Sequence, residues 1–170
     1  MTKRSSLFDK PDSFGWISIA LHWSTALAIV ALWFVGKSIA FQAEEALDAR
    51  RSLHITLGLI FWLPLAARIA WRILVAHPHA SGQSRLTHNL ARTAHYLLLA
   101  LLLLMLVSGP LLAWLAPGKA GITEVLLFVH ANTALVLAML VGLHVLAALK
   151  HLMFHEDETI ARIFLPRKDN

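Results

Sequence analysis

The chain alternates between long apolar stretches and short polar connections. Four such stretches can be read, at about 14–36, 53–75, 89–115 and 124–154. Each is long enough to cross a bilayer core as a helix, which takes roughly 20 apolar residues. The connections GKSIAFQAEEALDARRS, HPHASGQSR and APGKAG are polar or contain proline and glycine as helix breakers. The pattern therefore predicts four membrane-spanning helices.

These stretches predict an all-α fold, a transmembrane four-helix bundle forming a single membrane domain over 1–170. The first stretch follows the basic residues MTKR like a secretory signal, but it is too long, contains His22 and lacks a clean cleavage site. We expect it to be retained. At 156–165 we expect a short surface helix with Ile160, Ile163 and Phe164 on one side. A solvated, frayed end is the alternative for that segment.

Composition narrows the class of protein further. Of 170 residues, 58% are hydrophobic and 15% charged, and the mean hydropathy is +0.65, which excludes an ordinary soluble domain. The chain has no cysteine, which excludes disulfides, thiolate zinc sites, iron–sulfur clusters and covalently attached haem. Any cofactor must therefore be bound through nitrogen or oxygen atoms.

The distribution of basic residues predicts the orientation. Most of the 15 lysines and arginines fall with the two termini and the second connection, and the exceptions are Lys37, Arg50, Arg51 and Lys119. Because basic loops stay on the cytoplasmic side, both termini are expected to be cytoplasmic. There the formal charge of +5 would face anionic membrane lipid rather than nucleic acid, for which we predict no role.

Histidines inside the apolar stretches are the main chemical signal. Ionisable residues are costly in a membrane and usually face the bundle interior. Those that fit best are His22, His54, His130 and His144. His130 and His144 are 14 residues apart, so they lie within roughly 40° of the same helix face and about 21 Å apart along it.

Depth predicts how these histidines pair. His22 lies about two turns into the first helix from the cytoplasmic side, and His54 lies in the first turn of the predicted second helix. We therefore expect His22 to face His144 in the inner half of the membrane, and His54 to face His130 in the outer half. Two facing imidazoles can bind one haem iron from both axial sides, which favours electron transfer over oxygen binding.

Other interpretations of the histidines remain. A single buried histidine is more often a hydrogen-bonded packing residue, and a plain structural bundle would need nothing more. A zinc or copper transport path would normally add carboxylate or thiolate ligands, and in these segments only Glu124, at an edge, qualifies. Four histidines at matched depths favour haem over both alternatives.

Residues near the histidines suit a flat, anionic cofactor. Arg68 follows His54 by 14 residues and is expected to neutralise a haem propionate on the cytoplasmic side. Arg72 could do the same or extend to the lipid headgroups. Gly58 and Gly142 could let a porphyrin approach the backbone, although glycine also serves plain helix packing.

Two further histidines have open roles. His151 follows His144 by two turns and is expected at the cytoplasmic rim. Its role could be that of a proton donor, a quinone hydrogen-bond partner or a solvated helix end. His95 could face inward or simply pack.

The sequence resembles the bacterial cytochrome b561 family, small four-helix di-haem cytochromes related to the membrane subunits of hydrogenase and formate dehydrogenase. The resemblance covers nearly the whole chain and rests on the order of LHW at 21–23, LHITLGL at 53–59, Arg68 and Arg72, VH at 129–130, GLH at 142–144 and LPRK at 165–168.

The resemblance implies two haem b groups whose axial iron ligands match His22, His54, His130 and His144. It also implies a multi-pass protein of the bacterial inner membrane that exchanges electrons with the quinone pool. Some similar proteins oxidise superoxide outside and reduce ubiquinone, here near His151 and 16–18. The alternative is a haem-bearing anchor that passes electrons between quinone and a separate dehydrogenase or periplasmic redox partner.

Overall fold

The computed structural model describes residues 6–11, 13–75, 85–115, 120–154 and 161–164. The fold is all-helical, and within these residues the only β feature is an isolated bridge between Lys10 and Ser13. The elements are α1 (Trp16–Ser38), the 3-10 turn η1 (Ile39–Phe41), α2 (Glu44–Leu74), α3 (Arg85–Leu115), α4 (Ala120–Phe154) and the short α5 (Ala161–Phe164). The helices α1 to α4 are long and apolar enough to cross a membrane, as predicted.

Helix α2 differs most from its expected bounds. It begins at Glu44, so EEALDARRS forms helix and not a loop, and η1 makes most of the turn after α1. Glu44 and Glu45 stand in the first turn, where carboxylates stabilise the positive end of the helix dipole. His54 consequently lies well inside α2 and not in its first turn. α3 begins at Arg85 and α4 at Ala120, slightly earlier than expected, and α5 lies within the predicted 156–165.

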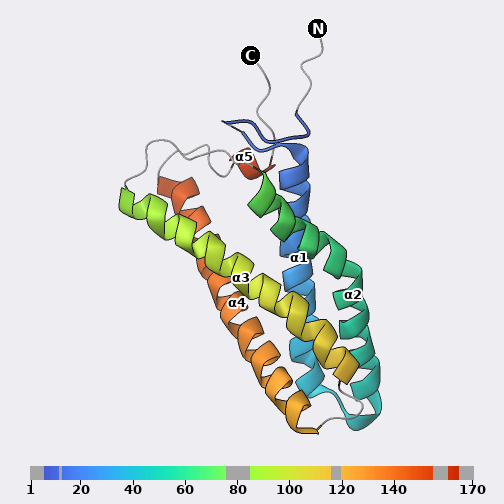
Figure 1. Cartoon of the computed structure of the whole chain (residues 1–170). Helices are drawn as coiled ribbons and strands as arrows, with labels where there is room; N and C mark the ends of the chain where they lie inside the picture. The colour runs from blue at the N-terminus through green and yellow to red at the C-terminus, as the bar shows by residue number, and fades with distance from the viewer. Residues whose placement is uncertain (1–5, 12, 76–84, 116–119, 155–160, 165–170) are drawn as a thin grey trace.

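The bundle is made of two helical hairpins, α1–α2 and α3–α4 (Figure 1). Helices α2 and α3 join the hairpins, whereas α1 only touches α4 and the described parts of α2 and α4 make no close backbone approach. We call the end where α1 begins and α4 ends the proximal end, and the opposite end the distal end. Contact between α4 and the first hairpin is therefore made mainly by side chains, except where α1 touches α4.

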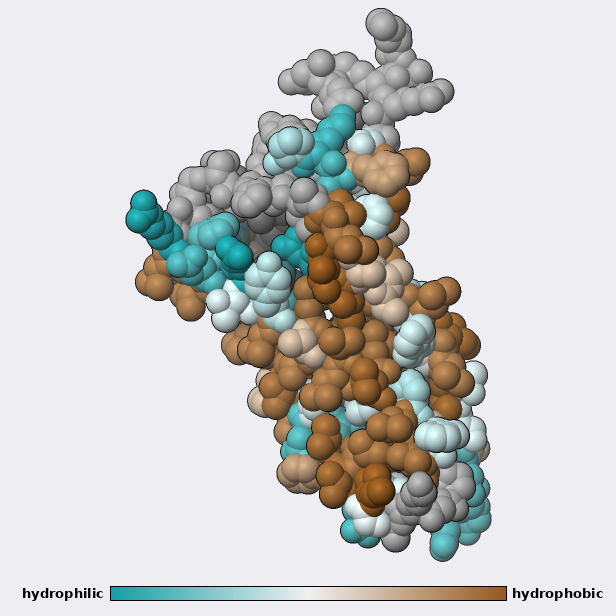
Figure 2. Space-filling view, in the orientation of Figure 1, coloured by the Kyte–Doolittle hydropathy of each residue, from teal (hydrophilic) through white to brown (hydrophobic). Residues whose placement is uncertain are grey.

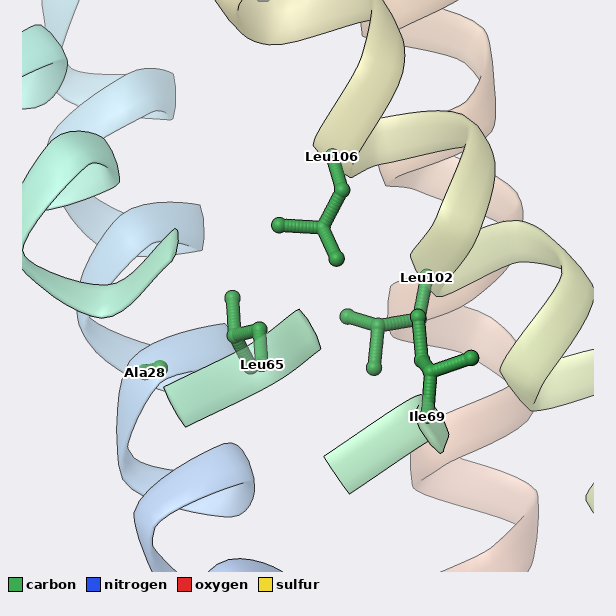
Figure 3. Packing of buried hydrophobic residues seen from close by; sticks show 5 residues of the cluster. All are labelled: Ala28, Leu65, Ile69, Leu102 and Leu106. Atoms are coloured by element: carbon green, nitrogen blue, oxygen red, sulfur yellow. The ribbon is translucent and has the colours of Figure 1, made fainter. Parts of the chain in front are cut away.

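A small apolar cluster joins three of the helices at mid-height (Figure 3). Ala28 of α1 packs with Leu65 and Ile69 of α2 and with Leu102 and Leu106 of α3. Elsewhere the long helices expose large apolar side chains, and the visible face is mainly hydrophobic between polar ends (Figure 2). Such a surface suits lipid, which solvates apolar side chains as well as a protein core does.

A proline in α3 creates a second link between the hairpins. Pro110 has no N–H, so the carbonyl of Leu106 lacks its usual helical partner. The indole N–H of Trp62 in α2 donates to that carbonyl at 3.1 Å. Because an unpaired carbonyl is costly inside a membrane, this bond stabilises the contact between α2 and α3.

The segment before α1 folds over the proximal end. Asp9 accepts hydrogen bonds from the backbone of Gly15 and the hydroxyl of Ser18, both at 2.8 Å. Ser18, which is buried, in turn accepts one at 2.8 Å from the indole of Trp71 in α2. This chain of bonds fixes α1 against α2 at the proximal end.

Candidate functional site

The proximal pair of imidazoles comes from α1 and α4. The rings of His22 and His144 have centroids 6.4 Å apart and planes inclined by 57°. Helix α3 adds His95, whose ring meets His144 edge-on at 5.2 Å. Nδ1 of His95 donates to the carbonyl of Ala91 at 2.6 Å, so in the neutral His95 ring Nδ1 carries the proton and Nε2 the lone pair. The proximal site therefore contains three histidines.

The distal pair comes from α2 and α4. The rings of His54 and His130 have centroids 6.3 Å apart and planes almost perpendicular, at 85°. Nδ1 of His130 lies 2.9 Å from the hydroxyl oxygen of Ser108 in α3. Nδ1 of His54 is buried and has no hydrogen bond of ordinary geometry, although the carbonyl of Leu32 lies close enough to polarise the ring. The histidines thus face each other in the two predicted pairs.

The spacing of both pairs fits one metal atom between two imidazoles. An imidazole nitrogen binds such a metal at about 2 Å, which places two ring centroids on opposite sides of it about 6 Å apart. The observed separations are 6.4 Å and 6.3 Å. Within the described residues α2 and α4 make no close backbone approach, so at the distal pair the contact between these two helices is left to side chains. The residues therefore fit axial ligation of haem.

A bare metal ion fits less well. Across the described ranges, no three histidine, aspartate or glutamate side chains gather closely enough to bind one ion. At the distal site two imidazoles alone would leave such an ion with an incomplete ligand set, whereas a porphyrin supplies four nitrogens of its own.

Glycines on neighbouring helices make room for the distal rings. A Cβ at Gly36 of α1 would lie 2.9 Å from Cε1 of His54, and one at Gly109 of α3 would lie 3.3 Å from Cε1 of His130. The glycines singled out from the sequence, Gly58 and Gly142, would meet no atom within 4 Å. The glycines that touch imidazoles are therefore not the ones we expected.

Two arginines stand at the proximal level. Arg68 lies within electrostatic range of His22, His95 and His144, and Arg72 within range of His95. Asp9 is close enough to both guanidinium groups to offset part of their charge. Two partly buried positive charges at the proximal end of an apolar bundle suit an anionic group bound beside the histidines.

Other residues near the two sites were only partly foreseen. His151 lies in the last turn of α4, half-buried at the proximal end. The sequence left His95 undecided and gave no role to Ser108, Gly36 or Gly109. A usable signal for two of them was the run Ser108, Gly109 and Pro110, which interrupts the apolar run at 97–115.

Comparison with known proteins agrees with this arrangement. The family model described as prokaryotic cytochrome b561 matches residues 13–166. The chain is 26% identical to cytochrome b561 homolog 2 of Escherichia coli strain K12, over 93% of this chain and 94% of that protein. Proteins of this family bind haem b and transfer electrons across membranes. With a match that extends over nearly its whole length, this chain belongs to the prokaryotic cytochrome b561 family.

Proposed function

We propose that the chain binds two haem b groups and conducts electrons between the two sides of the membrane. His22 and His144 would hold the proximal haem, and His54 and His130 the distal one. The observation that carries the proposal is the presence of two facing imidazole pairs, whose ring centroids are 6.4 Å and 6.3 Å apart.

The bound haem supplies an iron that takes up and releases one electron at a time. The two histidines of each pair would hold the iron between them, which would leave no open position for oxygen. His130 and His144 place the pairs about 21 Å apart along α4. Two sites at that spacing cover most of a bilayer core of about 30 Å.

Arg68 and Arg72 are proposed to bind the carboxylates of the proximal haem. A guanidinium group can donate two parallel hydrogen bonds to a carboxylate, and each charge compensates the other in the low-dielectric bundle. The same positive charge opposes the ferric state and so raises the potential of the proximal haem. That bias would favour movement of electrons toward the proximal end.

The distal haem is proposed to receive electrons from superoxide, and ubiquinone to take them at the proximal end. Two superoxide ions would give two electrons and leave as dioxygen, while ubiquinone would take two electrons and two protons to become ubiquinol. Lys37, next to Gly36, and Arg50, one turn before His54, would supply local positive charge on the distal side, where Glu44, Glu45, Asp48 and Glu124 balance the four bases overall. Arg51 contributes less because Asp48 lies 3.6 Å away, and Lys119 lies outside the described residues.

The quinone is proposed to lie near His151 and Trp16. Ser18, also expected there, already donates to Asp9 and accepts from Trp71, so its hydroxyl is committed to the fold. On this proposal the proximal end is cytoplasmic and the protein spans the bacterial inner membrane, because cytoplasmic loops carry the excess of basic residues.

A haem-bearing anchor for a separate redox protein is the second candidate. Leu7 and Phe8 precede the first spanning helix, and each exposes 60% of its surface. Exposed apolar side chains at the end of a membrane bundle suit contact with a partner protein. In this case electrons would pass between quinone and a dehydrogenase or periplasmic protein.

Spectroscopy of the purified protein tests the common part of both candidates. A reduced-minus-oxidised spectrum should show a b-type α band, with about two haems per chain by pyridine haemochrome assay. A colourless protein from haem-replete cells would overturn the proposal. Stopped-flow mixing with superoxide and ubiquinone then separates the candidates, because reduction no faster than that of free haem would leave only the anchor.

A further inference from the structure

Helix α3 brings a hydroxyl group to the distal imidazole pair. Ser108 exposes only 2% of its surface, and its Oγ lies 2.9 Å from Nδ1 of His130 on α4. It is one of the few buried polar side chains in the bundle. A buried hydroxyl is retained at little cost only where it has a partner, and here the partner is one of the two rings.

This hydrogen bond determines which nitrogen of His130 faces the interior. A neutral imidazole has one nitrogen that donates and one that carries a lone pair. If Nδ1–H donates to Ser108, Nε2 keeps the lone pair that a metal requires. The serine hydroxyl can itself donate a hydrogen bond to a carbonyl of the preceding helical turn.

The residues next to Ser108 hold it in place. Gly109 leaves room for the ring, since a Cβ there would lie 3.3 Å from Cε1 of His130. Pro110 releases the carbonyl of Leu106, and the indole of Trp62 binds it, so α3 is fixed to α2 at this level. Ser108 therefore approaches His130 from a rigid part of the bundle.

The two distal rings differ in this respect. Nδ1 of His54 is buried with only the carbonyl of Leu32 near it, outside the usual hydrogen-bond geometry, whereas Nδ1 of His130 lies 2.9 Å from the hydroxyl of Ser108. Hydrogen bonding at the outer nitrogen raises the basicity of a metal-bound imidazole and fixes its orientation. A change at Ser108 should therefore affect one side of the distal site alone.

We propose that Ser108 is a positioning residue for the distal haem: it holds the His130 ring with Nε2 toward His54 and lowers the haem's reduction potential. The inference rests on the proposed function, because it requires haem at the distal pair. It goes further by assigning the orientation and potential of that haem to a residue that touches neither iron nor porphyrin.

The test compares three variants of the full-length haem protein. Ser108→Ala removes the hydroxyl, Ser108→Thr retains it, and Thr133→Val removes another buried hydroxyl of the bundle as the matched control. The readouts are a potentiometric titration of the α bands, the electron paramagnetic resonance g values of the ferric haems, and haem retention, measured as the loss of haem to added apomyoglobin.

In Ser108→Ala we expect one of two potentials to rise and the g values of that haem to change as the ring turns. Haem retention should fall about 10- to 100-fold at that site, as for other outer hydrogen-bond partners of metal ligands. Ser108→Thr and Thr133→Val should resemble the wild type.

The outcomes separate this inference from the proposed function. A wild type without haem would overturn both. A wild type with two b haems, but with potentials and g values unchanged in Ser108→Ala, would overturn only the role of Ser108. An equal shift of the potential in Ser108→Ala and Thr133→Val would also overturn only the role of Ser108.

Discussion

Gly36 of α1 lies directly against the imidazole of His54 of α2, so close that a Cβ at residue 36 would be 2.9 Å from Cε1 of the ring. A side chain at residue 36 would require the ring to move. The position of the distal imidazole therefore depends on the helix next to its own.

Gly36→Ala should consequently displace His54. A methyl group at this distance must push the ring or separate the helices, and such overpacking typically costs about 1–3 kcal/mol. We expect the distal haem to be reduced to a small fraction, with the proximal haem retained. Haem quantification and low-temperature α-band spectra measure both.

The other glycines give a graded control for this prediction. Gly109→Ala, where the Cβ would lie 3.3 Å from His130, should have a weaker effect, and Gly58→Ala, which meets nothing within 4 Å, almost none. Equal haem loss in Gly36→Ala and Gly58→Ala would show that helix packing in general, not the ring contact, is responsible.

His144→Ala and His130→Ala should each lose a different haem. One missing axial nitrogen leaves five-coordinate, weakly held iron. His144→Ala should lose the proximal haem and His130→Ala the distal one, leaving about one haem per chain in each case. Potentiometric titration of both variants identifies the haem that remains, and loss of the same haem from both would contradict the pairing.

Arg68→Leu should lower the potential of the proximal haem. Removing a partly buried positive charge makes the oxidised, more positive iron easier to form, and the effect should exceed that of an exposed charge. The distal potential should not change. Arg92→Leu is the matched control, because Arg92 is an exposed cation of the proximal half, beside the ring of Tyr96. Identical titrations for Arg68→Leu and the wild type would exclude the proposed propionate contact.

Trp62→Phe should destabilise the bundle by about 1 kcal/mol, the usual net value of one hydrogen bond. The indole N–H stabilises the bundle because Pro110 leaves the carbonyl of Leu106 without a helical hydrogen-bond partner. In Pro110→Ala, whose N–H can restore the helical bond, the same Trp62→Phe change should cost less. Unfolding in detergent micelles, followed for all four members of this double-mutant cycle, measures the difference, and equal costs in both backgrounds would refute the link.

Much of this architecture could be predicted from the sequence because it depends on length, periodicity and depth. Apolar stretches longer than a bilayer core predict spanning helices whatever their neighbours. The 14-residue interval from His130 to His144 places both on one helix face by helical geometry alone. Alternating directions of successive helices then bring His22 to the level of His144 and His54 to that of His130.

Contacts between helices depended on the tertiary structure. Helix rotation and the angle between axes decide which small residue meets a ring, so Gly36 and Gly109, not Gly58 and Gly142, border the imidazoles. Packing also brought His95 to His144 and Ser108 to His130. Sequence periodicity describes each helix separately, whereas these contacts arise from how α3 lies across the other helices.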